Sequence, residues 1–108
     1  MIAAPPPPAQ QVHNLVGNVR AFDSLARRIW GGDAALVTLQ IDSTLIRIDK
    51  ARRGPAPRLA REITTLQRQG KIALRTLDPG ESALAHDAIS SLRTNLALFG
   101  AMLKRLTR

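Results

Sequence analysis

The stretch PRLAREITTLQRQGKIALRTL, residues 57–77, carries the pattern that decides the fold. Advancing about 100° per residue from Leu59, apolar side chains return to one face of a helix on both sides of Gly70. A new element beginning after Gly70 would have no reason to keep that phase. The sequence therefore predicts one continuous amphipathic helix over 57–77, in which Gly70 costs about 1 kcal/mol relative to alanine. The predicted inner face consists of Leu59, Ile63, Leu66, Gly70, Ala73, Leu74 and Leu77.

The opposite face of this helix is basic. Arg61, Arg68 and Arg75 recur every seven residues, which places adjacent arginines about 10 Å apart along one side. Residues 50–75 hold eight basic residues against Glu62 alone, in a chain of formal net charge +8. Such a surface can bind nucleic acid phosphates or an acidic protein, although a solvated face that aids solubility is the simpler interpretation. The candidate polyanion-binding residues are Lys50, Arg52, Arg53, Arg58, Arg61, Arg68, Lys71 and Arg75.

The segment before this helix admits two interpretations. Residues 35–49, ALVTLQIDSTLIRID, alternate in part as strands do, with Asp42-Ser43 as a conceivable hairpin turn. That dipeptide, however, supplies no glycine for the positive φ of a tight hairpin turn. We therefore predict a helix over 34–52 rather than a hairpin, with Asp33 as its N-cap. Gly54-Pro55-Ala56-Pro57 then separates it from the basic helix.

As a helix, residues 34–52 are apolar on two sides. One stripe consists of Val37, Ile41, Leu45 and Ile48, and a second of Leu36, Leu39, Ser43 and Ile46. A helix that is apolar on two sides needs covering on two sides, which favours a central position or a subunit contact. The last helix adds a stripe of small residues, Ser90, Thr94, Ala97 and Ala101, with Leu98 beside it. The predicted self-association residues are Leu36, Leu39, Ile46, Ala97, Leu98 and Ala101.

Two further helices complete the prediction. Residues 10–30 carry apolar side chains at spacings of three and four, and Gly31-Gly32 ends the pattern. Residues 79–106 form the last helix, with Asp78 predicted as its N-cap and Glu81 reaching back to the cap. Four helices with short connections predict an all-α, antiparallel four-helix bundle, or helical hairpins completed by a homodimer.

The ends and the composition bound the rest. Residues 1–9, MIAAPPPPA, predict a Pro-rich disordered tail before a single helical domain over 10–108. No secretory signal and no long apolar run occurs, so we expect no membrane span and a cytoplasmic protein. The chain has no cysteine, which excludes disulfides and thiolate metal sites.

No arrangement of residues predicts catalysis. His13 and His86 lie far apart in the chain, and two histidines without cysteine make no metal site by spacing. His86 and Ser90 lie one helical turn apart, but Asp87 points about 100° away from them and nothing supplies an oxyanion site. We therefore expect no enzyme, no cofactor, no metal and no small-molecule substrate.

One helix resembles part of a known family. Residues 84–100, LAHDAISSLRTNLALFG, resemble the phosphorelay helix of histidine phosphotransfer domains, which are four-helix bundles of this size with an exposed histidine. The resemblance covers this helix alone and implies phosphate transfer through His86. The family's motif places Lys three and Gly four residues after the histidine, where this chain has Ile89 and Ser90. We therefore do not assign the chain to that family.

Two other functions are better supported by the sequence than phosphate transfer through His86. The first is a small non-enzymatic interaction or structural protein that acts through helix surfaces and forms a homo-oligomer. The second is sequence-tolerant nucleic-acid binding through residues 50–75. The scarcity of aromatic residues makes base stacking an unsuitable mode for that binding.

Overall fold

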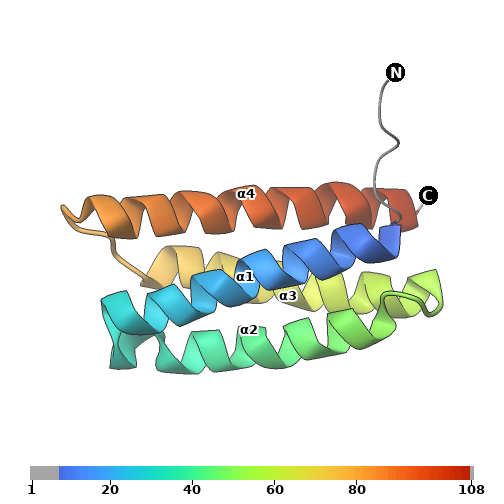
Figure 1. Cartoon of the computed structure of the whole chain (residues 1–108), viewed down its shortest axis with the longest axis horizontal. Coiled ribbons are helices and arrows are strands. Elements are labelled where there is room, and N and C mark those ends of the chain that lie inside the picture. The colour runs from blue at the N-terminus through green and yellow to red at the C-terminus, as the bar shows by residue number, and fades with distance from the viewer. Residues whose placement is uncertain (1–7, 108) are drawn as a thin grey trace, which may run out of the picture.

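The computed structural model describes residues 8–107 of the chain and consists of four α-helices (Figure 1). These are α1 (Pro8–Trp30), α2 (Gly32–Ala51), α3 (Ala56–Thr76) and α4 (Ala83–Leu106). The predicted all-α fold is confirmed. Residues 36–48 are helical rather than a hairpin, and α3 runs through Gly70 without a break.

The helices form an antiparallel bundle in which each helix packs against the one before it, and α4 closes the bundle against α1. Figure 1 shows α4 along one edge and α2 along the other, with α1 and α3 between them. Within residues 8–107, neither α1 and α3 nor α2 and α4 bring Cα atoms within 8 Å of each other. The outer surfaces of α2 and α4 therefore belong to diagonally opposite corners of the molecule.

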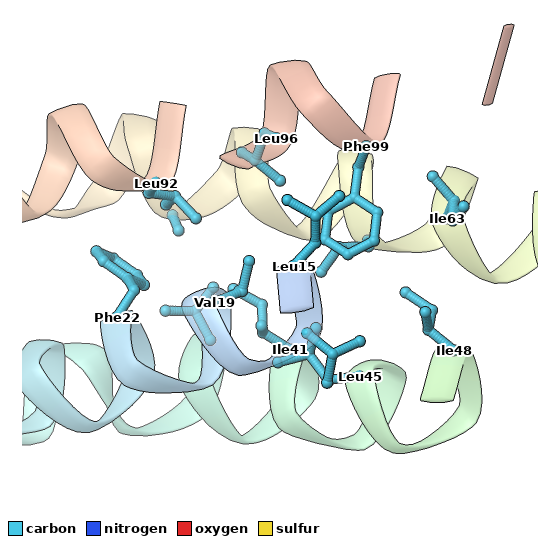
Figure 2. Close-up of a cluster of buried hydrophobic side chains, with 14 of the residues drawn as sticks. Leu15, Val19, Phe22, Ile41, Leu45, Ile48, Ile63, Leu92, Leu96 and Phe99 are labelled. Atoms are coloured by element: carbon cyan, nitrogen blue, oxygen red, sulfur yellow. The ribbon is translucent and has the colours of Figure 1, made fainter. Parts of the chain in front are cut away.

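All four helices contribute to one hydrophobic core. Figure 2 shows side chains from each helix converging between the ribbons. Among the largest fully buried side chains are Ile41, Leu45, Ile48, Ile63, Leu66, Leu92 and Phe99. The chain thus closes its core alone, and a second copy is not needed to complete it.

The connection between α1 and α2 is a single residue. Gly31 has φ 57°, a left-handed conformation that glycine adopts without steric cost, and its N–H donates to Arg27 O at 3.0 Å. Gly31 itself precedes α2, and no side chain caps that helix. The prediction that Asp33 caps α2 was therefore wrong. Asp33 lies inside the first turn, because the helix begins two residues earlier than predicted.

α4 begins four residues later than predicted, at Ala83. Gly80 has φ 54°, which the first turn of a right-handed helix cannot contain. Asp78 instead accepts a hydrogen bond from Gly80 N–H at 2.9 Å, within the loop. Ser82 is the N-cap, and its Oγ accepts from Ala85 N–H at 3.2 Å. The predicted cap at Asp78, with Glu81 reaching back to it, was wrong.

Gly70 lies in the contact between α3 and α4. A Cβ built at this position would lie 2.8 Å from Cδ2 and 3.1 Å from Cγ of Leu96, and closer still to Cδ1. Beside it, Gln67 Nε2 donates to Leu96 O at 2.7 Å. The glycine that appears as a weak point in the sequence therefore makes room for the neighbouring helix.

The predicted tail largely lies outside the described residues, which begin at Pro8. Pro8 and Ala9 belong to α1, so the predicted boundary at residue 9 was wrong by two residues. Proline is tolerated in the first helical turn, where its missing N–H would have no partner. Within residues 8–107, no helix combines the length and apolar composition needed to cross a membrane, as the sequence predicted.

Candidate interaction surfaces

The outer face of α2 carries three large aliphatic side chains. Leu36 is 67% exposed, Leu39 63% and Ile46 48%, and Ser43 lies exposed among them. On the opposite side the same helix buries Val37, Ile41, Leu45 and Ile48 in the core. The structure thus confirms that α2 is apolar on two sides, and the bundle covers one of them.

Three charged side chains along the flanks of this face are paired within the chain. On the α1 side Asp42 accepts from Arg27 at 2.9 Å, and on the α3 side Arg47 donates to Glu62 at 2.7 Å. Asp49 lies 3.1 Å from His13 Nδ1 and 3.4 Å from Arg52 Nε. Lys50, at the end of the apolar stripe, makes no ion pair with any residue between 8 and 107. The exposed leucines and isoleucine therefore lie between flanks whose charges are largely compensated.

The candidate self-association residues of α4 lie elsewhere. Ala97 and Ala101 are exposed and Leu98 is 50% exposed, so they are surface residues as predicted. Leu98 and Ala101 border a groove of about 600 Å³ between α1 and α4, with Leu15 and Met102 in its floor. Because α2 and α4 occupy opposite corners, the structure does not bring the two predicted halves of the self-association surface together.

The predicted basic residues follow the outer face of α3 and its connection to α2. Arg61, Arg68 and Arg75 are exposed and form no ion pair among the described residues. Lys71 accompanies them, and with Arg68 and Arg75 it borders a shallow hollow of about 470 Å³ that Ile72 also lines. The helix rise places Arg61 and Arg75 about 20 Å apart, a length that spans several phosphates.

The other four basic residues cluster at the α2–α3 connection. Lys50, Arg53 and Arg58 are exposed, and they extend the positive surface beyond the first turn of α3. Arg52 differs, because it is partly buried and bound to Asp49. Seven of the eight predicted residues are therefore exposed and form no ion pair in the described chain, and Arg52 has a structural contact instead.

The sequence did not predict a buried carboxyl group, Asp23, which lies beside the partly exposed Asp42 between α1 and α2. Asp23 is fully buried, and neither of its oxygens accepts a hydrogen bond from an N–H or hydroxyl donor in the described structure. The buried Oδ1 of Asp42 also lacks such a donor. Burial foremost, and then the hydrogen bond and charge of Asp42, raise the pKa of Asp23 to about 9, although Arg27 and Arg20 oppose the shift. Protonated Asp23 can itself donate one hydrogen bond to Asp42, which engages one of the two Asp23 oxygens.

The phase of the helix could have revealed this buried carboxyl. Asp23 lies four residues after Val19 and three before Ala26, and both are fully buried. A carboxyl on the core stripe of an amphipathic helix is therefore a candidate for a shifted pKa.

The histidines have structural contacts. His86 Nε2 lies 2.9 Å from Gly80 O, and because a carbonyl only accepts, Nε2 carries the hydrogen. The exposed ring is thereby tied to the α3–α4 loop. His13 is bound to Asp49, at the other end of the bundle. No group of three or more His, Asp or Glu side chains within residues 8–107 could hold a metal ion.

Comparison with known proteins does not assign the chain to a family. No protein-family model, no curated protein and no solved structure matches the chain. The resemblance of residues 84–100 to histidine phosphotransfer domains thus finds no support beyond that helix.

Proposed function

We propose that this protein is a non-enzymatic helical interaction protein that self-associates through the outer face of α2. The observation that carries the proposal is the exposure of Leu36, Leu39 and Ile46 on the side of α2 that faces away from the core. Single exposed aliphatic residues are ordinary on protein surfaces, but here three lie at helical spacing on one face, interrupted only by the small Ser43.

The free energy available from this face sets the expected strength of association. Removing a large, fully exposed aliphatic side chain from water contributes about 1.5–3 kcal/mol, and about 1–2 kcal/mol when half to two-thirds is exposed. Six such side chains, three from each copy, contribute about 6–12 kcal/mol. Association costs about 4–15 kcal/mol in lost freedom of motion. A net gain of about 4–8 kcal/mol, reached where the apolar gain is near the top of its range and the association cost near the bottom, corresponds to a dimer that forms in the millimolar to micromolar range.

The test compares two double variants by light scattering at several protein concentrations. Leu39→Gln with Ile46→Gln makes the α2 stripe polar while keeping good helix formers. Ala97→Gln with Leu98→Gln is the matched control on α4. We expect the α2 variant to remain monomeric where the unmodified chain and the α4 variant associate. Association that survives in the α2 variant and disappears in the α4 variant would transfer the function to α4.

A second function has its own observation. The exposed arginines of α3 form a line without acidic partners in the described chain, which suits sequence-tolerant binding of a polyanion such as nucleic acid. Replacing Arg61, Arg68 and Arg75 with Glu should abolish binding to duplex DNA at low salt and leave the helix content unchanged. The control replaces Arg28, Arg93 and Lys104 with Glu, exposed residues on other helices, for the same change in net charge.

Equal loss of DNA binding in both charge-reversed variants would show that net charge alone drives it. Absence of binding by the unmodified chain at low salt would remove this second function altogether.

A further inference from the structure

We propose that two copies of the chain meet through α2 in antiparallel orientation, with Ser43 of each copy beside the two-fold axis. This inference rests on the proposed self-association and adds the partner's orientation and register to it. The partner is a second copy of this chain, docked on the outer face of α2.

The spacing of the exposed residues matches this geometry. Positions 36, 39, 43, 46 and 50 follow steps of three and four, the repeat of a two-helix contact. An antiparallel pair centred on residue 43 brings position 36 opposite 50 of the partner, and position 39 to within one residue, about 1.5 Å of helix rise, of position 46. Leu39 then packs against the other copy's isoleucine, and its own Ile46 against the other copy's leucine. The face is therefore complementary to itself, as a two-fold contact requires.

Ser43 suits the centre of the contact. It is exposed and carries a small side chain between two larger ones, Leu39 and Ile46. Two helices that cross at a small residue can approach closely, and the leucine and isoleucine on either side then interlock around the crossing point. A large side chain at the centre would separate the helices and leave the flanking pairs out of contact.

Charge distinguishes the antiparallel from the parallel orientation. The first turn of α2 carries Asp33, which forms no ion pair in the described chain, whereas the other end carries Lys50 and Arg53, also without ion pairs there, beside Arg52, which is bound to Asp49. A parallel pair would place the basic end of each chain against the basic end of the other, with the two Lys50 side chains directly opposite each other. The antiparallel pair brings each basic end to the level of the acidic first turn and leaves the aliphatic stem of Lys50 over Leu36.

The flanks of the stripe lower the cost of docking. Asp42 and Arg47 already have partners within their own chain, on the α1 and α3 sides respectively. When a second surface approaches and displaces water, charges that already have an ionic partner lose less hydration free energy than charges without one. The alternative contact, between α2 of one copy and α4 of another, joins unlike surfaces on opposite corners and would continue into an open chain of molecules rather than stop at two.

The test uses the absence of cysteine from the chain. Single variants Ser43→Cys and Leu36→Cys, and a mixture of Leu36→Cys with Lys50→Cys, are oxidised with glutathione disulfide at a concentration where the unmodified chain dimerises. Covalent dimers are counted by mass spectrometry. Ser90→Cys, the same substitution at an exposed serine of α4, is the matched control.

We expect Ser43→Cys to cross-link at least tenfold faster than Ser90→Cys. Leu36→Cys alone should behave like the control, and its mixture with Lys50→Cys should yield the mixed dimer. Rapid self-cross-linking of Leu36→Cys would show a parallel pair and overturn the orientation. Slow cross-linking of Ser43→Cys in a chain that light scattering shows to be dimeric would overturn the register. A monomeric unmodified chain instead overturns the proposed self-association itself.

Discussion

Asp23 shows how a single side chain can make this fold sensitive to pH. Its carboxyl lies in the core between α1 and α2, where burial and the neighbouring Asp42 raise its pKa from 3.8 to about 9. The basic groups that act on it, Arg27 and Arg20, are both on α1 and oppose the shift without cancelling it. Between the two pKa values, the folded chain therefore holds a proton that the unfolded chain has released.

This proton determines the sign of a pH effect on stability. Because the unfolded chain binds fewer protons, the free energy of unfolding falls as pH rises from about 4 to about 9, by up to about 1.4 kcal/mol per unit. Stability from this group is complete at the acid end of that range and lost as pH passes the folded pKa. Asp23→Asn, which is uncharged and of similar shape, should remove the slope, so that urea denaturation gives a more stable variant than the unmodified chain at pH 9.

Asp87→Asn is the control for this prediction, because Asp87 is exposed on α4. It should leave the dependence of stability on pH largely as it is. An unchanged slope in Asp23→Asn would show that Asp23 is charged in the folded chain or reaches water.

Gly70 and Gly17 give opposite predictions for the same substitution. Gly70→Ala gains helix propensity, but its Cβ would overlap Leu96, and overpacking of a core costs about 1–3 kcal/mol. Gly17 lies in the middle of α1, and a Cβ added there would meet no other atom within 4 Å. Gly17→Ala should therefore raise the free energy of unfolding by about 0.5–1 kcal/mol. Chemical denaturation of both variants measures the difference. If Gly70→Ala proves as stabilising as Gly17→Ala, the Leu96 side chain moves aside at little cost and the contact between α3 and α4 does not need glycine at this position.

At the scale of the helix, the start of α4 can be tested by capping. Ser82 accepts from Ala85 N–H, so Ser82→Ala should lower the free energy of unfolding by about 1 kcal/mol. Glu81→Ala should change it by less than about 0.5 kcal/mol, because Glu81 is exposed in the loop and is not a capping residue. The reverse order of the two effects in thermal denaturation would restore the helix start predicted from the sequence.

The elements also show what the sequence could and could not predict. The helical phase of residues 57–77 was sufficient to predict α3 through Gly70, because a repeated apolar stripe outweighs one unfavourable residue. The reason for that glycine was not predictable, since Leu96 belongs to another helix. Asp78 and Ser82 are both good N-caps by type, and the left-handed conformation of Gly80 decides between them. The capping preferences of single residues therefore do not predict which of the two begins α4.

At the scale of the whole molecule, the order of the helices around the bundle determines which surfaces can act together. The sequence predicted apolar or small residues on the outside of two helices, and both sets are exposed. The predicted antiparallel order, in which each helix packs against the one before it, already implies that α2 and α4 occupy opposite corners, and the prediction of self-association residues on both helices did not take this into account. The same arrangement places the basic face of α3 on a different corner from the α2 stripe. Lys50 belongs to both candidate surfaces, so self-association and polyanion binding can be tested separately with substitutions that leave Lys50 unchanged.

The central claim is that the bundle is complete as a monomer and pairs through α2. Sedimentation equilibrium of the unmodified chain, from low micromolar to millimolar concentration at moderate salt, tests it most directly. We predict a mass that rises from one chain to two and stops there, and that stays at one chain throughout in the Leu39→Gln, Ile46→Gln variant. A single-chain mass over the whole range, or a mass that rises without limit, would contradict the claim.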